Sequence, residues 1–192
     1  MPPRVKYTRE QIVSMGVEYV RKYGMESLSA RSLCKEIGCS PQPIFSCFEN
    51  MEELKREIIS RGYGVYLEFV EREIKSGKYP HYKSSGMAYI RFANEERELF
   101  ALLFMRDRST EKTERDEESI EPFIEMIQKV NGFTREQALY LHLQMWICVH
   151  GIAAMTATSY QRLDTELISK LLTDNYEALR ARIREQSDSS GI

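Results

Sequence analysis

The chain has 192 residues, 42% of them hydrophobic, and a formal net charge of −2. This is long enough for one large domain, or for a small domain followed by a larger one. The charge excludes a protein that is basic over its whole surface, so any nucleic-acid binding must come from a local patch.

Helical periodicity runs along the whole chain, and no alternating strand pattern of useful length occurs. The first helix is predicted between a capping box at Thr8 and Gln11 and a stop at Gly24. Its apolar residues fall on one stripe: Ile12, Val13, Gly16, Val17 and Val20.

Two short helices come next. Ser29 is expected to cap the first of these helices, which ends at Gly38. Ser40 is expected to cap the second, with Pro41 at its first position. The inward residues of the latter are predicted to be Ile44, Phe45 and Phe48.

Asn50 and Glu53 predict the start of a long helix over residues 51–75. Loops are expected at 76–86 and at the charged segment 106–119. Further helices are predicted at 86–105, 117–130, 134–158 and 165–185.

Two short helices joined by a tight glycine turn are typical of a helix-turn-helix, which places its second helix in the major groove of DNA. The same pattern also occurs as a corner in helical bundles without DNA binding. Spacing alone leaves both interpretations open.

The residues themselves resemble a family. Residues 8–59, with "LSARSLCKEIG" and "CSPQPIFSCFENMEEL", are similar to the DNA-binding domain of TetR-family transcriptional regulators. Further on, "AYIRFANEERELFALLF" at 88–104 and "WICVHG" at 146–151 resemble the C-terminal domain of a TetR subgroup with Trp, His and Gly in one helix. That domain binds ligand and dimerises in the subgroup.

The resemblance implies an all-α fold, with an N-terminal three-helix helix-turn-helix domain followed by a helical-bundle ligand-binding and dimerisation domain. The expected boundaries are 1–54 for the first domain and 55–186 for the second. Residues 187–192 are expected to form a disordered tail.

The resemblance also implies a DNA-binding set. Gln42 is the best candidate reader of adenine, and Arg31 can reach guanine. Arg4 and Lys6 are expected to contact phosphates or a minor groove. The full set is Arg4, Lys6, Ser29, Arg31, Ser40, Gln42, Pro43, Phe45, Ser46, Cys47, Met51 and Lys55.

Phe45, Cys47 and Met51 depart from the family pattern, which has Tyr, His or Tyr, and Lys at these positions. The family side chains donate hydrogen bonds or charge to the DNA backbone. Residues 1–62 carry a net charge of only +2. We therefore expect weak non-specific DNA binding, or compensation by Arg4, Lys6, Arg31 and Lys55.

The four cysteines form no CxxC pair, and no signal sequence is apparent, which favours a reducing cytoplasm. The spacing of Cys34, Cys39 and Cys47 fits no common zinc pattern. We interpret Cys34 and Cys39 as small buried hydrophobic residues, and Cys47 as the thiol to test for reactivity.

The C-terminal half is rich in Met and aromatic residues, which suit both a core and an adaptable apolar pocket. His142 and His150 lie too far apart on one helix to share a metal ion, so His150 is expected to be hydrogen-bonded in the bundle or to serve a ligand cavity. Candidate ligand-binding residues are Phe69, Met87, Phe104, Phe123, Met126, Tyr140, Trp146 and His150.

No catalytic motif, metal site or cofactor motif is evident, and the longest apolar run, at 145–155, is shorter than a membrane span. The resemblance therefore implies a cytoplasmic homodimeric regulator, a repressor, that binds a double-stranded palindromic operator and is released by a small, largely apolar effector. The alternatives are a TetR-like sensor or interaction module with weak DNA binding, and a helical enzyme with scattered site residues.

Overall fold

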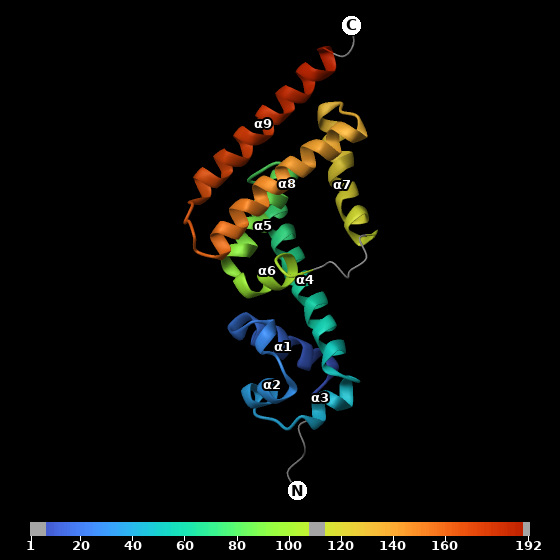
Figure 1. Cartoon of the computed structure of the whole chain (residues 1–192), viewed down its shortest axis with the longest axis vertical. Helices are drawn as coiled ribbons and strands as arrows, with labels where there is room; N and C mark the ends of the chain where they lie inside the picture. Colours follow the sequence, from blue (N-terminus) through green and yellow to red (C-terminus); the bar gives the residue numbers. More distant parts are fainter. Residues whose placement is uncertain (1–6, 108–113, 190–192) are drawn as a thin grey trace. The chain divides into compact units, whose positions relative to one another are not determined.

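The computed structural model describes residues 7–107 and 114–189, which are helical and contain no strand (Figure 1). The predicted all-α fold class is confirmed. The helices are α1 (Arg9–Tyr23), the short 3-10 helix η1 (Met25–Ser27), α2 (Ala30–Ile37), α3 (Gln42–Cys47), α4 (Met51–Lys75), α5 (His81–Glu95), α6 (Arg97–Phe104), α7 (Glu114–Asn131), α8 (Arg135–Ala157) and α9 (Thr165–Ser189).

Side-chain caps explain where the first helices begin. The Thr8 hydroxyl accepts a bond from the Gln11 amide at 3.2 Å, and the Gln11 side chain accepts one from the Thr8 amide at 2.9 Å. Ser29 caps α2 in the same way, accepting from the Ser32 amide at 3.1 Å. Both predicted caps are confirmed, because each satisfies amides that have no partner within the helix.

The predicted helix at 86–105 is two helices, α5 and α6. The backbone leaves helical geometry at Glu96 (φ −122°, ψ 54°), whose carboxylate accepts two 2.8 Å bonds from the Arg21 guanidinium of α1. Helix α5 also begins earlier than predicted, at His81. At this start the Ser84 amide donates to the Pro80 carbonyl at 2.8 Å, and the buried Ser84 hydroxyl donates to the Tyr79 carbonyl at 3.1 Å.

Two other segments contain more helix than their sequence suggested. Segment 106–119, predicted as a loop, is helical from Glu114, although residues 108–113 lie outside the described part. Helix α9 continues to Ser189, into the expected tail, while residues 190–192 lie outside the described part.

The chain divides into two compact units. The first contains the residues up to Glu68 together with Glu95–Arg106, and the second contains Phe69–Asn94 and the residues from Asp107 onward. Helix α6, which lies within the predicted range 55–186, therefore belongs to the first unit, where it packs on α1.

The core of the first unit depends on a close approach of α1 and α4. A Cβ atom added at Gly16 would lie 2.4 Å from Cδ1 of the fully buried Ile58, so a larger residue has no room there. The buried residues around this contact include Ile12, Val17, Val20, Leu33, Ile44, Phe48 and Leu54.

The second unit is a helical bundle in which α8 packs against α7 and α9. Phe69 and Phe92 meet edge to face, with ring centroids 5.4 Å apart. The Glu73 carboxylate is buried and forms a 2.7 Å ion pair with Arg91 of α5. Burial of a carboxylate is tolerated here because a guanidinium neutralises it.

Candidate DNA-binding surface

Helices α2 and α3 form a helix-turn-helix. Gly38 ends α2 in the left-handed conformation (φ 69°, ψ 33°), which glycine adopts without steric cost. Pro41 then occupies the N-cap of α3 without a side-chain cap bond, so the predicted cap by Ser40 is not formed. Proline suits this position because its missing amide hydrogen would have no helical partner.

Ile44 and Phe48 attach α3 to the core. Their exposed fractions are 0% and 2%, and they lie one helical turn apart. Six of the predicted DNA-binding residues in the motif are exposed, and we call them the recognition surface: Ser29, Arg31, Ser40, Gln42, Phe45 and Ser46.

Phe45 corrects one prediction. Its side chain is 52% exposed and does not turn inward. Each helical residue is rotated by about 100° from the one before it, so Ile44 can face the core while Phe45 faces away. An aromatic ring therefore stands in solvent on the recognition surface, near Gln42.

The other predicted DNA contacts differ in availability. Arg31 forms no ion pair within the described parts of the chain, so its guanidinium is free to meet a phosphate or a base edge. Lys55 is paired with Glu52 at 2.8 Å, and the Ser46 hydroxyl donates to the Gln42 carbonyl at 2.8 Å. Three more are half-buried, namely Pro43, Cys47 and Met51, while Arg4 and Lys6 lie outside the described residues.

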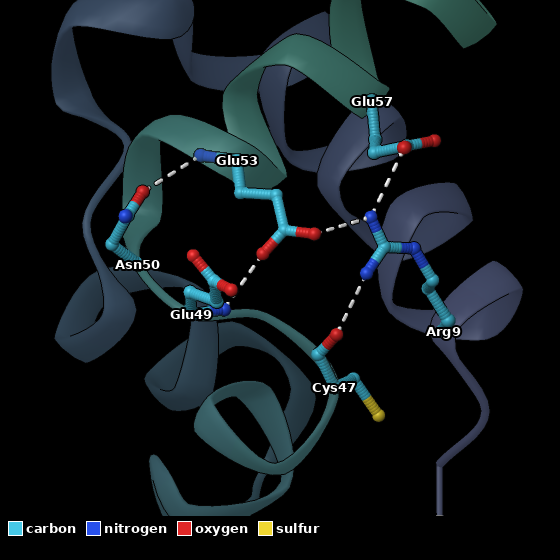
Figure 2. Close-up of polar contacts among 6 residues, drawn as sticks. All are labelled: Arg9, Cys47, Glu49, Asn50, Glu53 and Glu57. Atoms are coloured by element: carbon cyan, nitrogen blue, oxygen red, sulfur yellow. Dashed lines mark hydrogen bonds and ion pairs between the residues drawn. The ribbon is translucent and has the colours of Figure 1, made fainter.

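The end of α3 is held by a cluster that the sequence did not reveal. We call it the Arg9 cluster: Arg9, Cys47, Glu53 and Glu57 (Figure 2), together with the Phe48 ring. The Arg9 guanidinium donates to the Cys47 carbonyl at 2.8 Å and to the carboxylates of Glu53 and Glu57 at 2.8 and 3.0 Å. It also lies 4.4 Å from the centre of the Phe48 ring.

Glu53 extends this cluster to the start of α4. Its amide donates to the Asn50 side chain at 2.9 Å, and its second carboxylate oxygen accepts from the Glu49 amide at 2.7 Å (Figure 2). The Glu49 amide, followed by Arg9, lowers the pKa of Glu53, and the bonds to Glu53 and Glu57 raise the pKa of Arg9. Both groups therefore remain charged, and one guanidinium joins the ends of α1, α3 and α4.

Sequence reasoning missed Arg9 because its partners are distant along the chain. Cys47 and Glu57 are separated from it by 38 and 48 positions. Helical periodicity and capping patterns report on neighbours within about two turns, so they carry no signal of such contacts.

The candidate ligand-binding residues do not form one group. Phe104 belongs to the first unit, where its ring meets that of Tyr66 at 5.3 Å. The other candidates lie in the second unit and range from buried (Phe69, Met87) through half-buried (Phe123, Met126, His150) to exposed (Tyr140, Trp146).

Two tyrosine–histidine pairs connect α5 with α8. The Tyr82 hydroxyl lies 3.0 Å from Nδ1 of His142, and the Tyr89 hydroxyl lies 2.9 Å from Nδ1 of His150. His150 is thus hydrogen-bonded inside the bundle, one of the two roles expected for it. His142 also stacks on Phe123, and burial lowers its pKa.

Helix α8 also has an exposed apolar face, formed by Tyr140, Leu143, Trp146 and Ile147. By length and composition alone this helix is apolar enough to cross a membrane. Helices in the core of a soluble protein meet the same criterion, and α8 buries Leu141, Met145 and Val149 in the bundle. Within the described residues, no group of His, Cys, Asp and Glu side chains is arranged to hold a metal ion.

These features define a class: all-helical proteins with an N-terminal helix-turn-helix unit and a C-terminal helical bundle. Residues 83–175 match the family model of the tetracyclin repressor-like C-terminal domain. No curated protein matches the sequence.

Solved structures resemble the whole chain. A TetR-like transcriptional regulator from Rhodococcus sp. RHA1 has a TM-score of 0.65 at 16% identity, covering 95% of this chain and 97% of that one. A putative TetR-family transcriptional regulator from Vibrio parahaemolyticus has a TM-score of 0.62 at 15% identity, covering 88% and 97%. The resemblance drawn from the sequence is confirmed: the chain has the fold of TetR-family transcriptional regulators, with a tetracyclin repressor-like C-terminal domain.

Proposed function

We propose that the protein is a cytoplasmic, ligand-responsive transcriptional repressor without enzymatic activity, which binds a palindromic DNA operator as a homodimer. The observation that carries this proposal is the recognition surface. It presents Gln42 and Arg31 to solvent on a helix-turn-helix whose second helix is attached to the core by Ile44 and Phe48. A carboxamide and a guanidinium are the side chains that pair with adenine and guanine in the major groove.

Dimerisation is proposed through α8 and α9 of two copies, in a two-fold four-helix interface. The exposed apolar face of α8 supports this, together with the exposed Leu167 of α9. A two-fold dimer would present two recognition surfaces to the two halves of a palindrome.

Release is proposed to follow binding of a small, largely apolar effector in the second unit. Its aromatic and Met residues would supply apolar contacts, and the Tyr82–His142 and Tyr89–His150 pairs would supply polar groups. Such an effector acts only if it binds the state that cannot hold DNA more tightly than the state that can. A thermal-shift screen with lipophilic compounds tests this part.

The test of DNA recognition is selection of DNA from a random library by the purified protein, at low and at moderate salt. We expect a palindrome to be enriched. Gln42→Ala should relax the base preference at one position per half-site, at a cost of about 1–3 kcal/mol per contact. Gln161→Ala is the matched control, because it makes the same change at an exposed glutamine of the second unit, away from the recognition surface.

A TetR-like sensor or interaction module with weak DNA binding is the second candidate function. The exposed Phe45 ring favours it, because phenylalanine has no hydroxyl for a phosphate. Absence of enrichment at both salt concentrations, with compounds still detected in the thermal-shift screen, would support this candidate and overturn the repressor.

A further inference from the structure

A pair of thiols lies in the turn that precedes α3. Cys34 is in the last turn of α2 and is buried, while Cys39 follows Gly38 and is partly exposed. Both are free cysteines.

The backbone ending of α2 brings these thiols together. With Gly38 in the left-handed conformation, the amides of Gly38 and Cys39 both donate to the Cys34 carbonyl, the latter at 3.0 Å. In this type of helix ending, the side chain after the glycine packs on the side chain of the last turn. Here both positions of that contact are cysteines.

The other cysteines lack such a partner. The Cys47 thiol lies 3.8 Å from the Tyr7 carbonyl, and Cys148 is in the second unit, on α8. Neither is bonded to another thiol within the described residues.

We propose that hydrogen peroxide converts Cys34 and Cys39 into a reversible intramolecular disulfide, which changes the turn between α2 and α3 and weakens DNA binding. Formation of the disulfide is argued from the positions of the two cysteines alone, whereas its effect on DNA binding rests on the proposed function.

The reaction balances in two steps. The partly exposed Cys39 sulfur attacks one peroxide oxygen, the O–O bond breaks, and Cys39 becomes a sulfenic acid while one water is released. The Cys34 sulfur then attacks the Cys39 sulfur, the S–O bond breaks, and the Cys34 proton leaves with the hydroxyl group as a second water. The two thiols lose two electrons in total, which the peroxide gains, and an added thiol reductant reverses the bond through a mixed disulfide.

The environment of Cys34 supports this order. Burial, followed by the neighbouring Cys39 thiol, raises the pKa of Cys34 to about 11. Cys34 is therefore a protonated, shielded thiol that does not react with peroxide first, because the thiolate is the nucleophile. The backbone ending of α2 nevertheless places it beside Cys39, whose amide donates to the Cys34 carbonyl at 3.0 Å, so it can close the bond once Cys39 has been oxidised.

The proposed effect on DNA follows from position. Gln42 follows Cys39 by three residues in the sequence. A disulfide requires a narrow range of Cα separations and dihedral angles, so closing it shifts the backbone that leads into α3. We expect a loss of DNA affinity of about tenfold, equivalent to one base contact.

The first experiment detects the bond without DNA. Full-length protein carrying Cys47→Ser is treated with hydrogen peroxide, its free thiols are blocked, and a trypsin digest is analysed without reduction. Lys35 lies between the two cysteines, so trypsin places them on separate peptides unless a disulfide joins them. We expect the joined peptide, lighter than the sum of the two reduced peptides by two hydrogen atoms and lost on adding dithiothreitol.

The contradicting result is oxidation of Cys39 to sulfinic or sulfonic acid, or a disulfide between two protein molecules, with no Cys34–Cys39 peptide. Cys39→Ser is the informative variant because the position is partly exposed, so folding is preserved, and it should yield no joined peptide. Cys148→Ser is the matched control and should still yield it.

The second experiment measures affinity for the selected palindrome before oxidation, after oxidation and after re-reduction. We expect a reversible loss of about tenfold that Cys39→Ser abolishes. A joined peptide with unchanged DNA affinity would overturn the regulatory effect. Failure of the reduced protein to bind any DNA would contradict the proposed function while leaving the peptide result valid.

Discussion

At the scale of single residues, adjacent side chains on α3 serve different purposes. Ile44 is fully buried beneath the helix-turn-helix, and Phe45 is exposed on its other side. Because apolar burial stabilises the fold only when the side chain leaves water, residues of similar hydrophobicity make unequal contributions to stability.

Alanine substitution should expose this difference. We expect Ile44→Ala to lower the free energy of unfolding by about 2–5 kcal/mol, since it leaves a cavity in a closed core. Phe45→Ala should change it by about 0.5 kcal/mol or less, because the ring already contacts water. Urea unfolding followed by circular dichroism measures both, and equal losses would contradict the orientation of α3.

Arg9 acts at the same scale through hydrogen bonds. Its guanidinium serves a carbonyl of α3 and two carboxylates of α4 at once, a geometry that the single ammonium group of lysine does not reproduce.

We expect Arg9→Lys to lower the melting temperature and to weaken DNA binding, because the end of α3 loses its link to α1. Arg61→Lys is the control, since Arg61 forms one exposed ion pair with Glu68 and exposed pairs contribute little. Thermal unfolding by circular dichroism is the measurement. A similar small change in both variants would show that the Arg9 cluster does not hold α3.

At the scale of elements, the second unit pairs α5 with α8 through Tyr82 and His142. Burial lowers the pKa of His142, so the folded protein binds a proton there less readily than the unfolded chain does.

The sign of the pH dependence follows. Below the ordinary histidine value of 6.5, the unfolded chain takes up a proton that folded His142 resists, so stability falls as pH drops through this value. We expect His142→Gln to reduce this dependence, while His81→Gln at an exposed position should leave it largely unchanged. Urea unfolding between about pH 5 and 8 is the measurement. If the free energy of unfolding changes with pH in His142→Gln as it does in the wild type, His142 is not the source of the pH dependence.

At the scale of the whole molecule, the exposed apolar face of α8 predicts self-association. Ile147 is 58% exposed on this face, and a second copy would remove it from water.

Ile147→Glu should convert the proposed dimer into monomers, because a carboxylate would be buried opposite its two-fold mate. Val130→Glu is the control, since Val130 is still more exposed, at 67%, but lies at the end of α7. Sedimentation velocity distinguishes the two states. If the Ile147→Glu protein is still a dimer, the interface lies elsewhere on the molecule. If the wild-type protein is a monomer, the proposed dimer is wrong.

The sequence was most informative where structure is local. The caps at Thr8 and Ser29 and the glycine turn at Gly38 involve residues within about one helical turn, so their side-chain chemistry predicts them. It was least informative about Arg9 and about the break at Glu96. These depend on partners tens of residues away, Glu53 for Arg9 and Arg21 for Glu96.

The sequence by itself determined the helical fold class and the two short helices with their turn, because these follow from helical periodicity and capping over short spans. The family resemblance rests on the identities of the residues in these motifs. Only the tertiary structure decided that Phe45 faces solvent, that Arg9 joins three helices, and that α6 belongs to the first unit. The physical reason is that burial and long-range hydrogen bonds depend on which surfaces meet, and a periodic pattern states only that a helix has an apolar side.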